Sequence, residues 1–183
     1  MTELVGITGL MGHGKDSVAW VLMTKYGFAR YRLATKVYAF AYAIDPLVQA
    51  DGEVVRLQSL VDRHGWEHAK RNYPDVRRIL QRIGNEGRTV FGKWFWVNQL
   101  LTSIPDSIPK AVVPDVRYLN EAAAFDKVIR VVRPEPHTDR IVAENLSHIS
   151  ETEQDQIYAD ATIINDGTLE DLTVKVMEIP WLR

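Results

Sequence analysis

The chain has 183 residues, of which 46% are apolar and 25% charged, with a formal net charge of −2. We expect one compact domain with a real hydrophobic core rather than two full domains. Since there are no cysteines, disulfides, thiolate catalysis and cysteine-ligated zinc are excluded. No apolar run approaches the roughly 20 residues that cross a bilayer, and the first residues do not resemble a cleaved signal segment, so we expect an unprocessed cytoplasmic protein.

Predicted strands and helices alternate along the chain. The short β-branched run 4–9 reads as a buried strand, and the helical spacing that begins at Asp16 ends at Gly27. This alternation, without obvious hairpin turns, predicts an α/β fold with a mainly parallel sheet, and residues 49–72 show no clear period. The other predicted elements are a strand at 28–33, a helix at 34–44 stopped by Asp45 and Pro46, a helix from Pro74 to Gly84, a helix at 95–104, a strand at 110–117, a helix at 118–125, strands at 127–134 and 161–166, and a helix from Leu169 capped by Thr168 and Asp171.

A glycine-rich loop joins the first strand to the first helix. Gly9, Gly14 and Lys15 satisfy the G-x-x-x-x-G-K spacing in a strand, loop, helix context. The backbone N–H groups of this loop, which includes Gly12 and His13, form a cradle for anions with the helix N-terminus, and Lys15 would reach the β- and γ-phosphates. A dinucleotide loop is excluded, because the spacing is G-x-x-G-x-G and no acid ends the second strand.

The residue after the lysine departs from the usual motif. Asp16 stands where a serine or threonine normally ligates Mg²⁺. Its carboxylate could hold the metal directly or through water while Ser17 contacts a phosphate. Alternatively, Asp16 is an acid stabilised by the dipole at the helix N-terminus, and both interpretations stay open.

Positive charge is concentrated in the middle of the chain. From Arg56 to Lys93 there are nine lysines and arginines against four acids, whereas from Glu144 to Asp171 there are eight acids and no lysine or arginine. This distribution favours a small anionic ligand over a nucleic-acid polymer, with a solvated charged face as the alternative. We expect binding neither to nucleic acid nor to membranes.

Arginines follow two predicted strands at the ends where open α/β sheets bind ligands. Asp115 and Arg117 come after the apolar run "AVV", and Arg133 ends "VIRVV". Phosphoryl transfer to a second phosphate needs cations more than a general base. The chain also lacks the N-K-x-D guanine motif of GTPases and the D-E pair of many motor ATPases. One arginine alone would indicate a surface salt bridge, but two beside a phosphate loop predict clamps on a phosphoryl group.

Seven segments resemble, in order and spacing, the bacteriophage deoxynucleoside monophosphate kinases, a branch of the P-loop nucleoside monophosphate kinases. The resemblance covers most of the chain except about residues 50–73. The segments are "GKDS" (14–17), "RRILQRIGNEGR" (77–88), "FWV" (95–97), "VVPDVRYLNEA" (112–122), "VIRVVRP" (128–134), "HISE" (148–151) and "INDGTLEDL" (164–172).

The resemblance implies a P-loop NTPase fold with a five-stranded parallel sheet flanked by helices. It implies one kinase domain over residues 1–183, with an acceptor-binding insertion at about 35–95 and a lid at about 134–150. The implied reaction is Mg²⁺-dependent transfer of the γ-phosphoryl group of ATP to a deoxynucleoside monophosphate (dNMP), which gives the diphosphate and ADP. The protein would act in the cytoplasm, that of the host if a phage encodes it, and the resemblance favours a homodimer.

The resemblance also implies roles for individual residues. Lys15, Arg117 and Arg133 would be catalytic, and Asp16 and Asp115 would hold the metal, with Arg140 as a second clamp. ATP would be bound by Gly12, His13, Gly14, Lys15, Asp16, Ser17, Asn165 and Gly167. The acceptor would be bound by Arg77, Gln81, Glu86, Arg88, Asp115 and Arg117.

Several features leave alternatives open. Gly84-Asn85 replaces the Gly-Thr pair common in the family, and Tyr38 stands where a lysine is common. The aromatic run 94–96 predicts core or a subunit interface rather than a base-stacking platform. "HISE" is either lid chemistry or a helix cap. The alternative functions are a kinase similar to dephospho-coenzyme A kinase, and a nucleotide-sensing P-loop module without catalysis.

Overall fold

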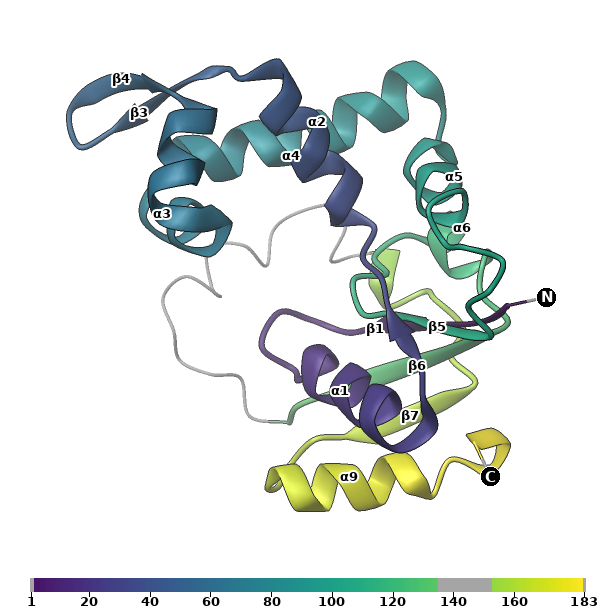
Figure 1. The fold of residues 1–183 in the computed structure, drawn as a ribbon. Helices are drawn as coiled ribbons and strands as arrows, with labels where there is room; N and C mark the ends of the chain where they lie inside the picture. The colour runs from purple at the N-terminus through teal and green to yellow at the C-terminus, as the bar shows by residue number, and fades with distance from the viewer. Residues whose placement is uncertain (1, 135–152, 183) are drawn as a thin grey trace. The chain divides into compact units, whose positions relative to one another are not determined.

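The computed structural model describes residues 2–134 and 153–182, which form two compact units (Figure 1). The first unit comprises Met1–Arg32 and Leu101–Arg183, and the second comprises Leu33–Leu100. The second unit therefore covers the range in which the resemblance implies an acceptor-binding insertion. No helix in the described part of the chain is both long and apolar enough to span a membrane.

The first unit is built on one parallel sheet. Its order is β2-β5-β1-β6-β7, and every neighbouring pair runs parallel. The strands are β1 (Glu3–Thr8), β2 (Ala29–Arg30), β5 (Lys110–Val113), β6 (Lys127–Val132) and β7 (Ala161–Ile164). The predicted α/β fold with a five-stranded parallel sheet is confirmed, although β2 is shorter than the predicted strand at 28–33.

Helices bury the apolar faces of this sheet. The helix α1 (Lys15–Tyr26) and the C-terminal helix α9 (Leu169–Met177) pack against each other and against the strands (Figure 1). Val18, Val21 and Leu22 of α1 are fully buried with Val5 and Ile7 of β1, as the apolar run of a central parallel strand requires. The helix α6 (Leu119–Ala122) and a final turn η1 (Pro180–Leu182) complete the unit.

The order of the strands indicates that ligands bind at the carboxyl ends of the central strands. β1 lies at the centre of the sheet, with β5 and β2 on one side and β6 and β7 on the other, so the strand order changes direction at β1. In open α/β sheets, ligands bind outside the carboxyl ends of the strands at such a switch point. The phosphate loop follows the carboxyl end of β1, and Asp115 and Arg117 follow that of β5. Arg133 follows the carboxyl end of β6, and the segment from Asn165 follows that of β7.

The second unit is mainly helical. Its helices are α2 (Ala34–Ile44), α3 (Leu57–Asn72), α4 (Pro74–Phe91) and α5 (Phe95–Leu101), whose last residue belongs to the first unit. A hairpin of β3 (Leu47–Ala50) and β4 (Glu53–Arg56) precedes α3. The sequence showed no obvious hairpin turn and no clear period over residues 49–72, so this hairpin was missed.

The predicted end of α4 at Gly84 was wrong, because the helix continues through Gly84 and Gly87 to Phe91. The indole of Trp96 in α5 covers this stretch, and its Nε1–H donates a hydrogen bond to the Gly84 carbonyl at 2.8 Å. A Cβ added to Gly87 would lie 2.6 Å from the same ring. Trp96 is only 5% exposed, so this part of the aromatic run is core, as predicted, whereas Trp94 is exposed.

Candidate active site

The phosphate loop connects β1 to α1 in the predicted way. The helix starts at Lys15, and the preceding Gly14 has a left-handed backbone with φ 98°. The Lys15 ammonium lies over its own loop, where it donates hydrogen bonds to the carbonyls of Gly9 (2.5 Å) and Leu10 (2.7 Å). Successive N–H groups and a lysine at a helix N-terminus make this loop suitable for binding phosphate groups.

Neighbouring segments hold the loop in shape. The Asn165 amide, after β7, donates a hydrogen bond to the His13 carbonyl at 2.9 Å, and the His13 ring Nδ1 lies 3.2 Å from the Val131 carbonyl oxygen of β6. Only glycine fits at two loop positions. A Cβ on Gly14 would lie 2.4 Å from Asn165 Nδ2, and a Cβ on Gly9 would lie 2.3 Å from the Val131 oxygen. Asn165 is 7% exposed and is thus a support of the loop.

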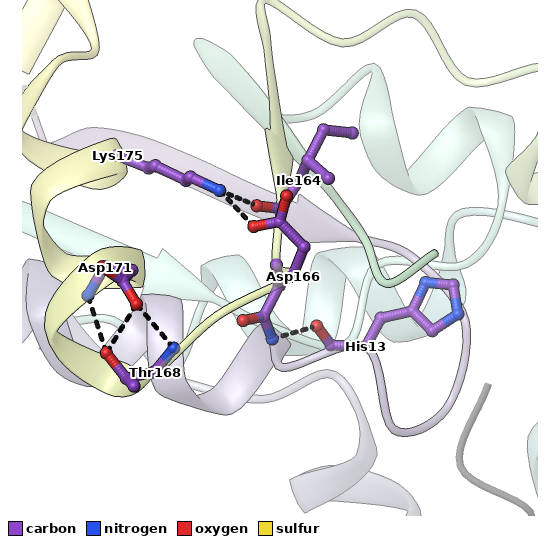
Figure 2. A network of polar contacts seen from close by, with 7 residues as sticks. His13, Ile164, Asp166, Thr168, Asp171 and Lys175 are labelled. Atoms are coloured by element: carbon purple, nitrogen blue, oxygen red, sulfur yellow. Dashed lines mark hydrogen bonds and ion pairs between the residues drawn. The ribbon is translucent and has the colours of Figure 1, made fainter. Parts of the chain in front are cut away.

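Polar contacts also fix the segment that follows β7 (Figure 2). The Lys175 ammonium of α9 donates to the Ile164 carbonyl at 2.8 Å and forms an ion pair with Asp166. The predicted cap of α9 is present, because the Thr168 hydroxyl accepts from the Asp171 N–H while the Asp171 carboxylate accepts from the Thr168 N–H and hydroxyl. The hydrogen bond from Lys175 lowers the pKa of Asp166, and the hydrogen bonds from Thr168 lower the pKa of Asp171.

Gly167 lies on this segment with Asn165, so two of the residues expected to bind ATP lie on one strongly held turn. A Cβ on Gly167 would lie 2.6 Å from Asp171 Oδ2, which shows how closely the cap carboxylate approaches the turn. The predicted ATP-binding residues of the loop and of this turn are therefore brought together by Asn165.

The structure gives Asp16 partners that the sequence did not reveal. Its carboxylate accepts hydrogen bonds from Arg30, at the end of β2, and from Arg32, whose Nη2 lies 2.9 Å from Oδ1. Neither of the two open interpretations included this ion-pair cluster. Because Arg30 ends β2 and Arg32 follows it, whereas Asp16 lies in α1, only the tertiary fold reveals the contact.

Two strand ends next to the loop carry the other predicted residues. Asp115 lies in the turn after β5, and exposed Arg117 follows two residues later. The buried carboxylate of Glu121 accepts hydrogen bonds from the backbone N–H groups of Arg117 (2.8 Å) and Tyr118 (3.2 Å), so it anchors the backbone from which Arg117 extends. Arg133 directly follows β6 and is half-buried. Sequence reasoning missed Glu121, because the residue three positions before it is Tyr118, which is not a usual N-cap residue.

The predicted acceptor residues of the second unit lie on α4. Arg77, Gln81 and Arg88 are spaced by four and seven residues, which puts them on one face of the helix. Glu86 lies about half a turn away from Arg77. There it lines an apolar cavity of about 370 Å³ between α2, α4 and α5, with Arg82 and Trp96 among its neighbours. α4 therefore does not bring Glu86 together with the other three residues.

Arg140 and the "HISE" segment lie outside the described residues. Within residues 2–134 and 153–182, no group of three or more histidine, aspartate or glutamate side chains forms a metal site by itself. A metal at the strand ends would therefore depend on one or two carboxylates together with the substrate phosphates, as is usual for Mg²⁺ in kinases.

Comparison with known proteins agrees with the fold and the loop. A sequence profile described as deoxynucleotide monophosphate kinase matches residues 66–176, which is more than half of the chain. No curated protein sequence gives a significant match.

Several solved structures are similar to the chain over nearly its whole length. TT1252 from Thermus thermophilus has 18% identity and a TM-score of 0.49, with 97% of this chain and 95% of that chain covered. Dephospho-CoA kinase from Campylobacter jejuni has 14% identity and a TM-score of 0.47, with 98% and 96% covered. Shikimate kinase from Aquifex aeolicus vf5 has 12% identity and a TM-score of 0.44, with 95% and 93% covered. Similarity at this level says nothing about activity.

A phosphate loop in a parallel α/β sheet defines the class of P-loop proteins that bind nucleotide phosphates. Within that class, the chain belongs to the deoxynucleotide monophosphate kinase family. It is therefore a phosphotransferase that acts on a small nucleotide. The matched segment begins after the phosphate loop, so the loop and the family match are independent observations.

Proposed function

We propose that the protein transfers the γ-phosphoryl group of ATP to a dNMP and so produces the diphosphate and ADP. The observation that carries this proposal is the phosphate loop after β1, the strand that lies between β5 and β6. Arg117 and Arg133 follow the carboxyl ends of these two neighbouring strands. Both nucleotides are anionic near neutral pH, so a site that joins them must supply several positive groups in fixed positions.

The predicted site residues of the first unit have the following roles in this proposal. The loop N–H groups from Gly12 to Ser17 bind the β- and γ-phosphates of ATP, and the Lys15 ammonium exchanges its two carbonyl partners for phosphate oxygens. Arg117 and Arg133 stabilise charge on the phosphoryl group during transfer. The turn with Asn165 and Gly167 lies beside the adenine.

The donor set at the strand ends fits a magnesium ion. Asp115 offers a carboxylate oxygen directly after β5, and Mg²⁺ in kinases is usually held by one or two carboxylates plus substrate phosphates. When bound, the ion would neutralise charge on the phosphate oxygens. Asp115 is the residue that we propose to hold it.

Three side chains on one face of α4 are proposed to bind the acceptor: Arg77, Gln81 and Arg88. The guanidinium of an arginine matches the geometry of a phosphate, and the amide of Gln81 can both donate and accept hydrogen bonds to a base or sugar. Glu86 is a weaker candidate, because it lies on the opposite face of α4. The homodimer is still a prediction from the resemblance. Analytical sedimentation of the purified protein measures its oligomeric state.

A coupled assay for ADP release tests the function. The acceptors are the four dNMPs, the four ribonucleoside monophosphates and dephospho-coenzyme A, each with ATP and Mg²⁺. We expect turnover with at least one dNMP. Turnover with dephospho-coenzyme A alone, or ATP binding without turnover of any acceptor, would refute the proposal.

Two variants test the assigned roles. Lys15→Ala and Arg117→Ala should each reduce transfer by about 100-fold or more, since clamps of this kind contribute strongly to phosphoryl transfer. Their melting temperatures should stay close to that of the wild type. Arg78→Gln is the matched control, because Arg78 is an exposed arginine whose carboxylate partner, Asp75, lies on the same helix. Full activity of Arg117→Ala would remove Arg117 from the mechanism.

A further inference from the structure

The carboxylate after the phosphate-loop lysine joins two elements that are not neighbours in sequence. Asp16 lies in the first turn of α1, and its Oδ1 accepts hydrogen bonds from the Nη2 groups of both Arg30 and Arg32. Arg30 is the last residue of β2, the strand at one edge of the sheet. The three side chains therefore connect the start of α1 to the carboxyl end of that edge strand.

This pairing makes Asp16 a poor ligand for a divalent cation. The same oxygen atom accepts hydrogen bonds from two groups that are always positively charged. A cation bound to Oδ1 would be repelled by both guanidinium groups, whose charges also offset the negative charge that would attract it.

The two arginines keep hydrogen-bond donors beyond those that Asp16 uses. Each guanidinium carries five N–H donors, and the contacts with Asp16 use one nitrogen of each group. The Nε atom of Arg30 is buried and has no hydrogen-bond partner in the described part of the chain. Two guanidinium groups and one carboxylate meet at this place, which leaves an excess of one positive charge. This excess of positive charge suits an anion with several oxygen atoms, such as a phosphate group.

The order of the strands indicates which phosphate this is. In the sheet order β2-β5-β1-β6-β7, the turn proposed for adenine follows β7 at one edge, and the loop proposed for the ATP phosphates follows β1 at the centre. In-line transfer requires the acceptor oxygen on the far side of the γ-phosphate from ADP. The far side is that of β5 and β2, where Arg30 and Arg32 lie.

We propose that Arg30 and Arg32 bind the phosphate group of the acceptor dNMP, and that Asp16 is a positioning residue that holds the two guanidinium groups instead of ligating Mg²⁺. The inference rests on the proposed function, because the identity of the phosphate depends on it.

The experiment separates binding of the acceptor from binding of the metal. The variants are Arg30→Gln, Arg32→Gln, Asp16→Asn and Asp16→Glu, with Arg78→Gln as control. The first measurement is the affinity of the accepted dNMP by calorimetry, in EDTA and without ATP. The second is the Mg²⁺ concentration that gives half-maximal turnover.

We expect Arg30→Gln and Arg32→Gln to weaken dNMP binding in EDTA by about tenfold or more, as loss of a charge-assisted hydrogen bond predicts. Asp16→Asn should weaken it in the same direction and leave the half-maximal Mg²⁺ concentration within about twofold of wild type. Asp16→Glu should recover part of the affinity, because it keeps the carboxylate. Melting temperatures show whether each variant is folded, and Arg32→Gln, at a partly exposed position, keeps the test available if Arg30→Gln does not fold.

Two results would overturn the proposal. The first is wild-type dNMP affinity in both arginine variants. The second is an Asp16→Asn variant that binds dNMP normally but needs about tenfold more Mg²⁺, since this identifies a metal ligand. If the wild type turns over no dNMP, the proposed function itself fails. The anion subsite is then decided by calorimetry with inorganic phosphate in EDTA, where equal affinity in the wild type and both arginine variants overturns it.

Discussion

The contact between α4 and α5 predicts opposite effects for two alanine substitutions only three residues apart. In Gly87→Ala, the new Cβ would lie 2.6 Å from Cζ2 and 2.9 Å from Cε2 of the Trp96 indole. A Cβ contact below 3.0 Å requires that one of the two groups move. Since Trp96 is 5% exposed and its ring is rigid, the indole must shift by roughly 1 Å or the helices must separate.

The expected cost has two parts. Overpacking of a buried site typically costs about 1–3 kcal/mol. A shift of the indole also lengthens the 2.8 Å hydrogen bond from Trp96 Nε1 to the Gly84 carbonyl, and loss of such a bond costs about 1 kcal/mol. The higher helix propensity of alanine returns about 0.5–1 kcal/mol. Gly87→Ala should therefore reduce the free energy of unfolding by about 1–3 kcal/mol.

Gly84→Ala is the matched control, because a Cβ at Gly84 meets no atom within 4 Å. Only the propensity gain remains, so this variant should be more stable than the wild type by about 0.5–1 kcal/mol. Urea denaturation followed by tryptophan fluorescence measures both variants. A Gly87→Ala variant as stable as Gly84→Ala would refute the close contact with Trp96.

Two further predictions concern the first unit. Asn165→Ala should weaken binding of both ATP and ADP by about tenfold, because the His13 carbonyl loses its donor and the phosphate loop loses a support. Calorimetry with ADP measures this, and unchanged affinity contradicts it. Burial alone would raise the pKa of Asp160, but the Lys127 ammonium and a backbone N–H bring it below its usual value. Asp160 therefore stabilises the fold above the unfolded-state pKa of about 4, and this contribution is lost as pH falls through the lower folded-state pKa. Asp160→Asn should be less stable than the wild type at pH 7, and the difference should shrink in acid, which urea titrations at pH 7 and pH 3 measure.

Local sequence signals predicted those elements whose ends are determined by residues at or next to the end. The helix α2 spans the predicted residues because Asp45 adopts a left-handed backbone at its end and Pro46 follows. The cap formed by Thr168 and Asp171 was likewise readable from their spacing. Four of the five strands of the parallel sheet, all but β2, are short runs that contain β-branched residues, which is a local strand signal.

Other elements depend on signals that were missed or on distant contacts. The hairpin β3–β4 turns at Asp51 and Gly52, which both have positive φ (53° and 85°), and an Asp-Gly pair is a local turn signal. By contrast, nothing local carries α4 past Gly84. The helix continues there because Trp96, twelve residues later, packs on it and binds the Gly84 carbonyl.

The candidate site divides in the same way. Motif spacing was enough to place the phosphate loop and the arginines after β5 and β6, because parallel strands end at one edge of the sheet. It could not show that Asp16 pairs with Arg30 and Arg32, or that Asn165 supports the loop across 152 positions. Those contacts depend on which strands are neighbours, and the order of strands is a property of the whole fold.

The extent of the family match bears on where specificity resides. The matched residues 66–176 include α4 and the ends of β5, β6 and β7, but they leave out the phosphate loop. A loop that binds phosphates through backbone N–H groups places few demands on side chains, so P-loop proteins with different acceptors can share it. Side chains that recognise one kind of acceptor must instead be particular to a family. Arg77, Gln81 and Arg88, which we propose to bind the acceptor, lie within the matched residues, so a search for base preference should begin with them.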